Sequence, residues 1–279
     1  SFAVEADKAA YIPTPLPDGT STEQVLRLVA PLLEADGEKV GQNVKYDWLV
    51  MARHGILVAG PFFDTMVAHY LIAPEEPHGL DALARRELGY QTIPISSLIG
   101  KGKVAKSMRE VPPVDVAPYA CEDADITLQL SAALRSQLEG AGVKQLAHDL
   151  EFPLVPVLSR MELAGIKLDE AALKELSAQT AEDLVKLESQ IFERAGEEFN
   201  IGSPAQIGTI LFDKLGLPVI SKTSTGKPST KESVLTELAA EHDLPGLILD
   251  WRELAKLKST YIDALGELVH PETGRIHTS

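Results

Sequence analysis

The sequence predicts two structural parts, an α/β part followed by a mainly α-helical part. The chain has 279 residues, which is enough for one large domain or two moderate ones. Short β-type runs alternate with helical patterns as far as about residue 140, which is typical of an α/β layer. After Gly140-Ala141-Gly142 the pattern becomes mostly helical. We therefore expect one domain over residues 1–143 and a second over residues 144–279.

The first elements should be a hairpin and a capped helix. Ala3-Val4 and Ala10-Tyr11-Ile12 are β-type runs separated by a polar turn, which predicts a hairpin. Ser21 and Gln24 have the spacing of a capping box, so a helix should start here.

Two further helices should begin beside polar motifs. Lys39-Val40-Gly41 is a short strand candidate, and a helix should follow from about Asn43. Pro118 is a good first helical residue with Asp115 just upstream, so another helix should begin there.

Leucines at helical spacing dominate the chain after residue 143. One series runs from Leu150 to Met161, before a turn at Gly165, and a longer series runs from Leu173 to Ile191. Two long neighbouring helices joined by a short loop favour antiparallel packing. We therefore expect these two helices to pack against each other.

A lysine-containing loop follows another capped helix in the second half. Ser203 and Gln206 have capping-box spacing, and Pro204 occupies the first helical position. The loop from Ser221 to Lys231 contains three lysines and no acidic residue. Ser229-x-x-Glu232 should cap the next helix. Lysines beside helix N-termini favour phosphate oxygens, although an exposed loop without a partner explains any one lysine equally well.

Composition limits the classes of protein that fit. The net charge of −15 argues against a surface that binds DNA over its whole extent, but local basic loops remain compatible with nucleic acid. The single cysteine, Cys121, excludes an internal disulfide framework and fits a reducing cytosol. No apolar run approaches the roughly 20 residues that span a bilayer, so we expect no membrane association and a cytoplasmic location.

Two acidic motifs carry the candidate chemistry. Tyr119 and Asp123 are four residues apart, which places the hydroxyl and the carboxylate on one helix face, whereas Asp125 points elsewhere. A phenol beside a metal-binding carboxylate can orient a water for attack on a phosphodiester. Asp47 lies near the start of its own helix, close to Asn43. Taken alone, Tyr-x-x-x-Asp is common and usually belongs to a solvated helix face.

The ordered series of motifs resembles a known family. Gly41-Gln42-Asn43-Val44-Lys45-Tyr46-Asp47, then Phe63-Asp64-Thr65-Met66, then Tyr119-Ala120-Cys121-Glu122-Asp123-Ala124-Asp125 are similar to motifs of the tyrosine-bearing DEDD 3′→5′ exonucleases. Leu254-Ala255-Lys256-Leu257-Lys258-Ser259-Thr260-Tyr261 and Thr273-Gly274-Arg275-Ile276-His277-Thr278 resemble the thumb and the palm entry of bacterial family A DNA polymerases. The resemblance implies a ribonuclease-H-like exonuclease domain followed by a helical thumb and the first part of the palm.

The resemblance also implies roles for individual residues. Asp47 and Asp123 would be catalytic metal ligands for two Mg²⁺ or Mn²⁺ ions, and Tyr119 would orient the attacking water. Asp64 would be a supporting or structural residue and not a metal ligand, and Cys121 a small core residue. The residues that would contact DNA are Asn43, Ser203, Gln206, Lys222, Lys227, Lys231, Lys256 and Lys258.

The family's first exonuclease motif, Asp-x-Glu, does not occur between Ser1 and Lys39. Glu5 and Asp7 stand in the reverse order, so we expect the first strand to precede Ser1 and the chain to be a piece of a longer protein. The expected partners are primer–template DNA and single-stranded DNA 3′ ends, bound by a monomer. Deoxynucleotides would bind only the longer protein, whose polymerase site would lie beyond Ser279.

Two alternatives remain open on the sequence. One is a DNA-binding module with an incomplete or decayed exonuclease site, in which case the chain alone would be nearly inactive. The other is a stand-alone DEDD exoribonuclease, for which the first half alone would suffice.

Overall fold

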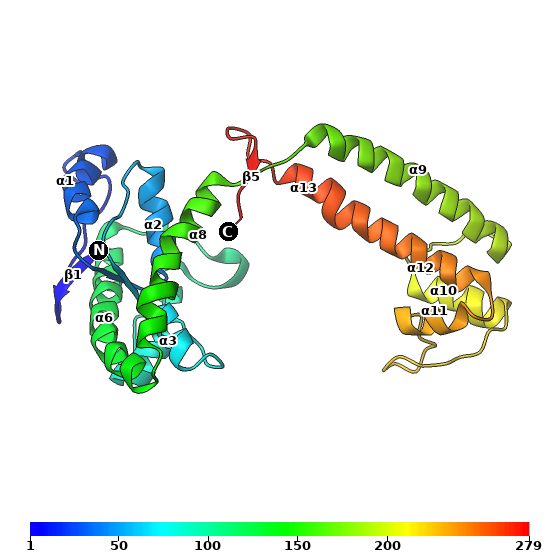
Figure 1. Ribbon diagram of the computed structural model, residues 1–279, viewed down its shortest axis with the longest axis horizontal. Helices are drawn as coiled ribbons and strands as arrows, with labels where there is room; N and C mark the ends of the chain where they lie inside the picture. Colours follow the sequence, from blue (N-terminus) through cyan, green and yellow to red (C-terminus); the bar gives the residue numbers. More distant parts are fainter. Residues whose placement is uncertain (279) are drawn as a thin grey trace. The chain divides into compact units, whose positions relative to one another are not determined.

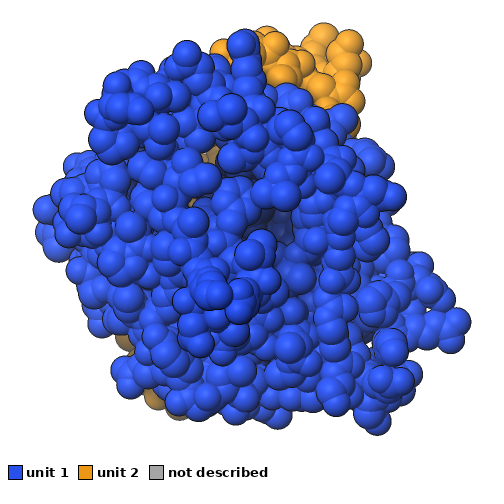
Figure 2. Space-filling model, turned by 90° about the vertical axis from the view of Figure 1, so that its left-hand side faces the viewer, with its two compact units in different colours: residues 1–163 blue, residues 164–279 orange. Residues whose placement is uncertain are grey.

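The chain forms two compact units, which a computed structural model describes for residues 1–278. The units are Ser1–Leu163 and the part from Ala164 onward, coloured separately in Figure 2. This division lies later than the boundary expected near residue 143. The reason is that Ala147, Phe152 and Val155 are buried in the core of the first unit.

The strands of the first unit are short and form two pairs. β1 (Phe2–Glu5) and β2 (Lys8–Ala10) form an antiparallel hairpin, as the sequence predicts, although Tyr11 and Ile12 lie outside it. β3 (Lys39–Gly41) pairs in parallel with β4 (Phe62–Asp64). The longest helix of the unit, α6, packs against β1, β2 and β3, so it underlies both pairs.

Helices make up most of the first unit (Figure 1). They are α1 (Thr22–Glu34), α2 (Val44–Arg53), α3 (Thr65–Ile72), α4 (Leu80–Leu83), α5 (Ser96–Ile99), α6 (Pro113–Gly140), α7 (Lys144–Leu146) and α8 (Phe152–Ala164), with short π or 3₁₀ segments at Ala84–Leu88 (η1), Gly102–Val104 (η2), Met108–Glu110 (η3) and Ala147–Glu151 (η4). The predicted capping box at Ser21 and Gln24 is confirmed at the start of α1.

Helix α6 begins earlier than expected. Pro113 occupies the first turn, and Pro118, expected to start the helix, lies inside it. A proline in the first turn costs the helix no hydrogen bond, because the N–H groups of that turn have no partner within the helix. The Pro112-Pro113 pair therefore starts the helix, and α6 continues through Pro118.

The second unit is built on two long helical segments. Its elements are β5 (Ile166–Lys167), α9 (Glu170–Ala195), α10 (Pro204–Gly208), η5 (Thr209–Lys214), α11 (Glu232–Leu238), α12 (Asp243–Lys256), η6 (Leu257–Asp263), α13 (Ala264–Glu267) and β6 (Arg275–Ile276). Helix α9 packs along α12 and η6 (Figure 1), and β5 pairs antiparallel with β6. The expected pairing of α9 with the preceding long helix is wrong, because α8 belongs to the core of the first unit.

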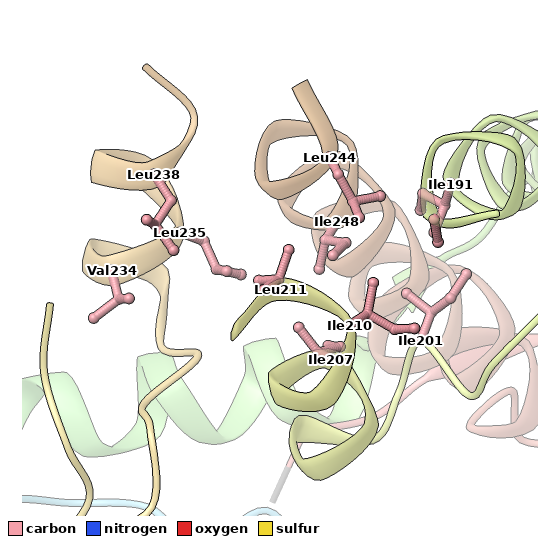
Figure 3. Close-up of a cluster of buried hydrophobic side chains, with 11 residues drawn as sticks. Ile191, Ile201, Ile207, Ile210, Leu211, Val234, Leu235, Leu238, Leu244 and Ile248 are labelled. Carbon is pink, nitrogen blue, oxygen red and sulfur yellow. The ribbon is translucent and has the colours of Figure 1, made fainter. Parts of the chain in front are cut away.

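The core of the second unit lies where α9, α10, η5, α11 and α12 converge. Leu235 and Leu238 of α11 face Leu211, and Leu244 and Ile248 of α12 lie on its other side (Figure 3). These side chains are fully buried. This core fixes the base of the segment between η5 and α11, which carries the predicted lysines.

Candidate functional site

The Tyr119–Asp123 pair lies on one face of α6, as its spacing predicts. The Tyr119 hydroxyl and the Asp123 carboxylate are close enough to affect each other's pKa. Burial raises the pKa of Asp123 to about 6, and the nearby Glu122 and Asp81 carboxylates add to the shift. Burial and the Asp123 charge also raise the pKa of Tyr119, so the phenol stays protonated at neutral pH and acts as a hydrogen-bond donor.

The other two acids of this motif are bonded to structural partners. Glu122 accepts hydrogen bonds from the Tyr90 hydroxyl at 2.8 Å and from the Ile93 N–H at 2.7 Å. Asp125 accepts from the Asp7 N–H at 2.8 Å and from Gln129 at 2.9 Å. Glu122 therefore holds the loop after η1, and Asp125 holds the β1–β2 turn. Among the described residues Asp123 has neither kind of partner, and the side chain of the motif that affects its pKa is Tyr119.

Asp64 is a structural residue that caps two helices at once. It is 1% exposed, and its carboxylate accepts hydrogen bonds from Asn43 and Val44 at the start of α2 and from Met66 and Val67 at the start of α3. Burial raises the pKa of Asp64, while the four N–H donors oppose that shift. With both oxygens occupied, Asp64 fits the supporting role expected from the sequence.

This double cap positions Asn43 and Asp47. Asn43 precedes α2 in a left-handed conformation with φ 58° and ψ 52°, which asparagine tolerates better than most residues. The Asn43 side chain makes no capping hydrogen bond and is exposed. Asp47 follows in the first turn of α2 and keeps solvent access. Desolvation by the surrounding protein nevertheless raises the pKa of Asp47 to about 6, and the Asp64 carboxylate contributes.

Helix α6 packs against β3, the strand that leads into α2. Within residues 1–278, however, no group of three or more His, Cys, Asp or Glu side chains is arranged to hold a metal ion. Asp47 and Asp123, the two carboxylates whose pKa values are raised to about 6, therefore do not form part of a full ligand set among these residues.

Cys121 is half-buried instead of lying in the core. It lines a cavity of about 420 Å³ together with Tyr90, Glu122 and Asp125. The helical spacing that separates Cys121 from the Tyr119–Asp123 face turns it toward the gap between α6 and the β1–β2 turn.

The predicted lysine loop of the second unit is an ordered hairpin. The Thr223 N–H donates to the Lys227 carbonyl at 2.8 Å, and the Ser229 N–H donates to the Ser221 carbonyl at 2.8 Å. Lys222 and Lys227 are exposed on this hairpin. The expected cap at Ser229 is wrong: α11 begins after Lys231, and the Ser229 hydroxyl accepts instead from the Lys231 N–H at 3.4 Å.

Four of the predicted lysines are free to meet a ligand. Ion pairs in the described part of the second unit involve Lys186, Arg194, Lys214 and Lys258. Among residues 1–278, no carboxylate pairs with Lys222, Lys227, Lys231 or Lys256, and all four are exposed. Lys258 differs, because its ammonium binds Asp263 and the Ser177 hydroxyl at 2.8 Å each.

Ser203 and Gln206 are used locally. The Ser203 hydroxyl caps α10 by accepting from the Gln206 N–H at 3.4 Å, as the sequence predicts. The Gln206 side chain does not complete the capping box; it accepts from the Asn200 N–H at 2.7 Å. Both residues therefore shape the turn into α10.

Sequence reasoning missed two anchoring residues, Glu122 and Arg252. The Arg252 guanidinium donates to the Thr230 carbonyl at 2.6 Å and so holds the end of the lysine hairpin. Arg252 lies two residues before the thumb-like motif that begins at Leu254, but its partner is a backbone carbonyl, which every residue possesses. No residue pattern could have singled out that acceptor.

Comparison with known proteins agrees with the two-part organisation. Residues 1–139 match the family model for a 3′-5′ exonuclease, and residues 170–279 match the model for DNA polymerase family A. The chain is 44% identical to a DNA polymerase I of Pseudomonas aeruginosa over 100% of its own length and 32% of that protein. It is 47% identical to a DNA polymerase I of Rhizobium leguminosarum, over 91% of the chain and 25% of that protein.

A solved structure shows the same arrangement of elements. The POL domain of Pol1 from M. smegmatis, in complex with DNA primer-template and dNTP, matches with a TM-score of 0.74 and 27% sequence identity. The match covers 94% of this chain and 43% of that one. The chain spans a third or less of the length of the curated relatives described above. By these matches residues 1–139 belong to the 3′-5′ exonuclease family and residues 170–279 to DNA polymerase family A.

Proposed function

We propose that the longer protein excises mismatched nucleotides from primer 3′ ends, and that this chain supplies part of its exonuclease site and holds the primer–template duplex for a DNA polymerase I. The observation that carries the proposal is the placement of Tyr119 and Asp123 on one face of α6, next to acids of the same motif that are bonded elsewhere. We further propose that the first unit is ribonuclease-H-like and that residues 144–279 include the thumb and the first part of the palm.

The proposed roles follow from the state of each side chain. Tyr119 keeps its proton, so its hydroxyl can donate to Asp123 and accept a hydrogen bond from a water, which orients that water toward a phosphodiester. Asp47 and Asp123, both with pKa values of about 6, are ionised at neutral pH. Asn43 is exposed beside Asp47, where its amide is proposed to steady the terminal nucleotide.

Asp47 and Asp123 are also our proposed ligands for Mg²⁺ or Mn²⁺. Such ions polarise the phosphate and lower the pKa of bound water. A two-ion site needs more oxygen ligands than two carboxylates supply, and residues 1–278 hold no third ligand in a group with these. These residues therefore do not form a complete two-ion site by themselves.

The second unit is proposed to hold duplex DNA through its backbone. Lys222, Lys227, Lys231 and Lys256 are exposed and unpaired in the described part of the chain, and they neutralise phosphates without reading sequence. Ser203 and Gln206 shape a helix start that is proposed to face the same backbone, and Lys258 would have to leave Asp263 to contribute.

Beyond the chain itself, the proposal concerns the longer protein. We propose that the protein works as a monomer in the bacterial cytoplasm, in DNA replication and repair. Nucleotidyl transfer, with deoxynucleotides as substrates, is proposed for the whole protein only.

The test is Mg²⁺-dependent degradation of a 3′-mismatched primer–template. It compares this chain with a version extended upstream by a segment bearing Asp-x-Glu, each with and without Asp123→Ala. We expect activity only in the extended version and its loss in Asp123→Ala. Tyr119→Phe should lower the rate by about 10²-fold, which is the usual effect of removing a positioned side chain that handles a proton.

The incomplete ligand group favours a second candidate, a DNA-binding module without nuclease activity. If neither version degrades the primer while duplex DNA is still bound, this second candidate replaces the first.

A further inference from the structure

We propose that Arg252 is a positioning residue that orients the lysine hairpin, Ser221–Lys231, for duplex DNA. The inference rests on the proposed function, because it concerns how the second unit holds the DNA backbone. In this role Arg252 acts through Lys222 and Lys227 and not by touching DNA itself.

The hairpin's own hydrogen bonds fix its shape. The Thr223–Lys227 and Ser221–Ser229 backbone bonds close it, and Gly226 turns its tip with a φ of +82° that glycine adopts readily. All of these bonds join one part of the hairpin to another. They leave open how the hairpin is directed relative to the helices.

The end of the hairpin is where its direction is set. Ser229 and Thr230 are each 6% exposed, in contrast to the exposed lysines. The Thr230 carbonyl accepts the 2.6 Å hydrogen bond from the Arg252 guanidinium, which comes from α12. This bond joins the hairpin to one of the two long helices of the unit.

Arg252 is more buried than is usual for a surface arginine that contacts only solvent. The side chain is half-buried, and burial lowers the pKa of its guanidinium. Among residues 1–278 no carboxylate forms an ion pair with it. Burying a charge is costly unless it is well bonded, and a charged donor makes a stronger bond to a carbonyl than a neutral one. The position therefore makes sense as an anchor.

Anchoring matters because a group that is already ordered before DNA binds loses less conformational entropy on binding. Lys222 and Lys227 lose less freedom on binding if the hairpin is held before DNA arrives. Without the bond from Arg252, the hairpin can swing on its two connections, and its lysines no longer reach phosphates together.

A double-mutant cycle separates anchoring from direct contact. Affinity for a 20-base-pair primer–template is measured by fluorescence anisotropy at several salt concentrations, without a divalent ion. The variants are Arg252→Met, Lys222→Ala/Lys227→Ala, and all three changes together. Arg194→Met, which removes one positive charge from an exposed ion pair in the same unit, controls for the change in net charge.

Positioning predicts losses that do not add. Lys222→Ala/Lys227→Ala should weaken binding about tenfold and reduce the salt slope by about 2, because two phosphate contacts are lost. Arg252→Met alone should weaken binding about fivefold. In the Lys222→Ala/Lys227→Ala background it should cause no further loss, because the effects of residues that act through one another do not add. Arg194→Met should change affinity less than twofold, as expected for a single rim charge.

Other results would overturn the inference. An additive loss from Arg252→Met would show that Arg252 meets DNA itself, and no loss would show that it does not orient the lysines. If the double lysine variant binds normally, the proposed DNA contact of the hairpin fails first. Circular dichroism reports folding; if Arg252→Met unfolds the unit, the cycle is run with Arg252→Lys, which keeps the charge but lacks the planar fork.

Discussion

At the scale of single residues, hydrogen-bond partners distinguish acids that the sequence presents alike. Glu122, Asp123 and Asp125 stand within one motif, yet Glu122 and Asp125 are bonded to a loop and a turn. Asp123 lies on the same helix face as Tyr119, and burial raises the pKa of its carboxyl to about 6. The same value holds for Asp47 at the start of α2.

These raised pKa values predict a pH dependence of stability with a definite sign. Carboxyl groups titrate near 3.9 in an unfolded chain, so the folded state binds more protons than the unfolded state between about pH 4 and pH 6. This contribution is full below about pH 4 and is lost as pH rises through about 6. Asp47→Asn/Asp123→Asn removes both titrations.

The variant should therefore lose less stability than the parent between pH 4 and pH 7. Urea unfolding of the first unit at several pH values measures the difference, with the exposed Asp149→Asn as control. A variant whose pH profile parallels that of the parent would contradict the raised pKa values.

At the scale of elements, one buried carboxylate sets the start of two helices. Asp64 accepts hydrogen bonds from the first turns of α2 and α3, at the end of β4. The first N–H groups of a helix have no partner within the helix, and a carboxylate also favours the positive end of the helix dipole. The placement of Asn43 and Asp47 thus depends on Asp64.

Asp64→Asn should lower the free energy of unfolding of the first unit by about 3 kcal/mol, because buried N–H groups lose a charged acceptor. The matched control is Asp169→Asn, at the exposed N-cap of α9, where asparagine caps equally well and the change should be near zero. Chemical denaturation measures both. Equal losses in the free energy of unfolding at the two positions would show that the double cap stabilises the protein no more than an ordinary N-cap does.

At the scale of the whole molecule, each compact unit has a hydrophobic core of its own. Leu134 belongs to a cluster within the first unit, and Leu211 to a cluster within the second. In the described residues no helix is long and apolar enough to cross a membrane. The net negative charge of the chain is not spread evenly over its surface, because the hairpin of the second unit carries exposed lysines without acidic partners among these residues.

Separate cores predict separate losses of stability. Leu211→Ala should destabilise the second unit by about 2–5 kcal/mol, the usual cost of a buried leucine, and leave the first unit unchanged. Leu134→Ala should do the reverse. Hydrogen exchange followed by mass spectrometry reports each unit separately, and a loss of protection in both units from one substitution would contradict independent cores.

The sequence by itself determined the features that depend on a few neighbouring residues. The capping box at Ser21, the cap at Ser203 and the shared face of Tyr119 and Asp123 were all predictable, because their partners lie within four residues. The family motifs were readable for the same reason, since each is a short stretch of the chain.

The tertiary structure alone decided the features whose partners are distant in sequence. Asp125 bonds to a residue 118 positions away, and Asp64 to residues 20 and 21 positions away. Within the π-helical η6, Leu257 and Tyr261 are exposed while Ile262 is buried. Such outcomes follow from packing between elements, which no local pattern of residues encodes.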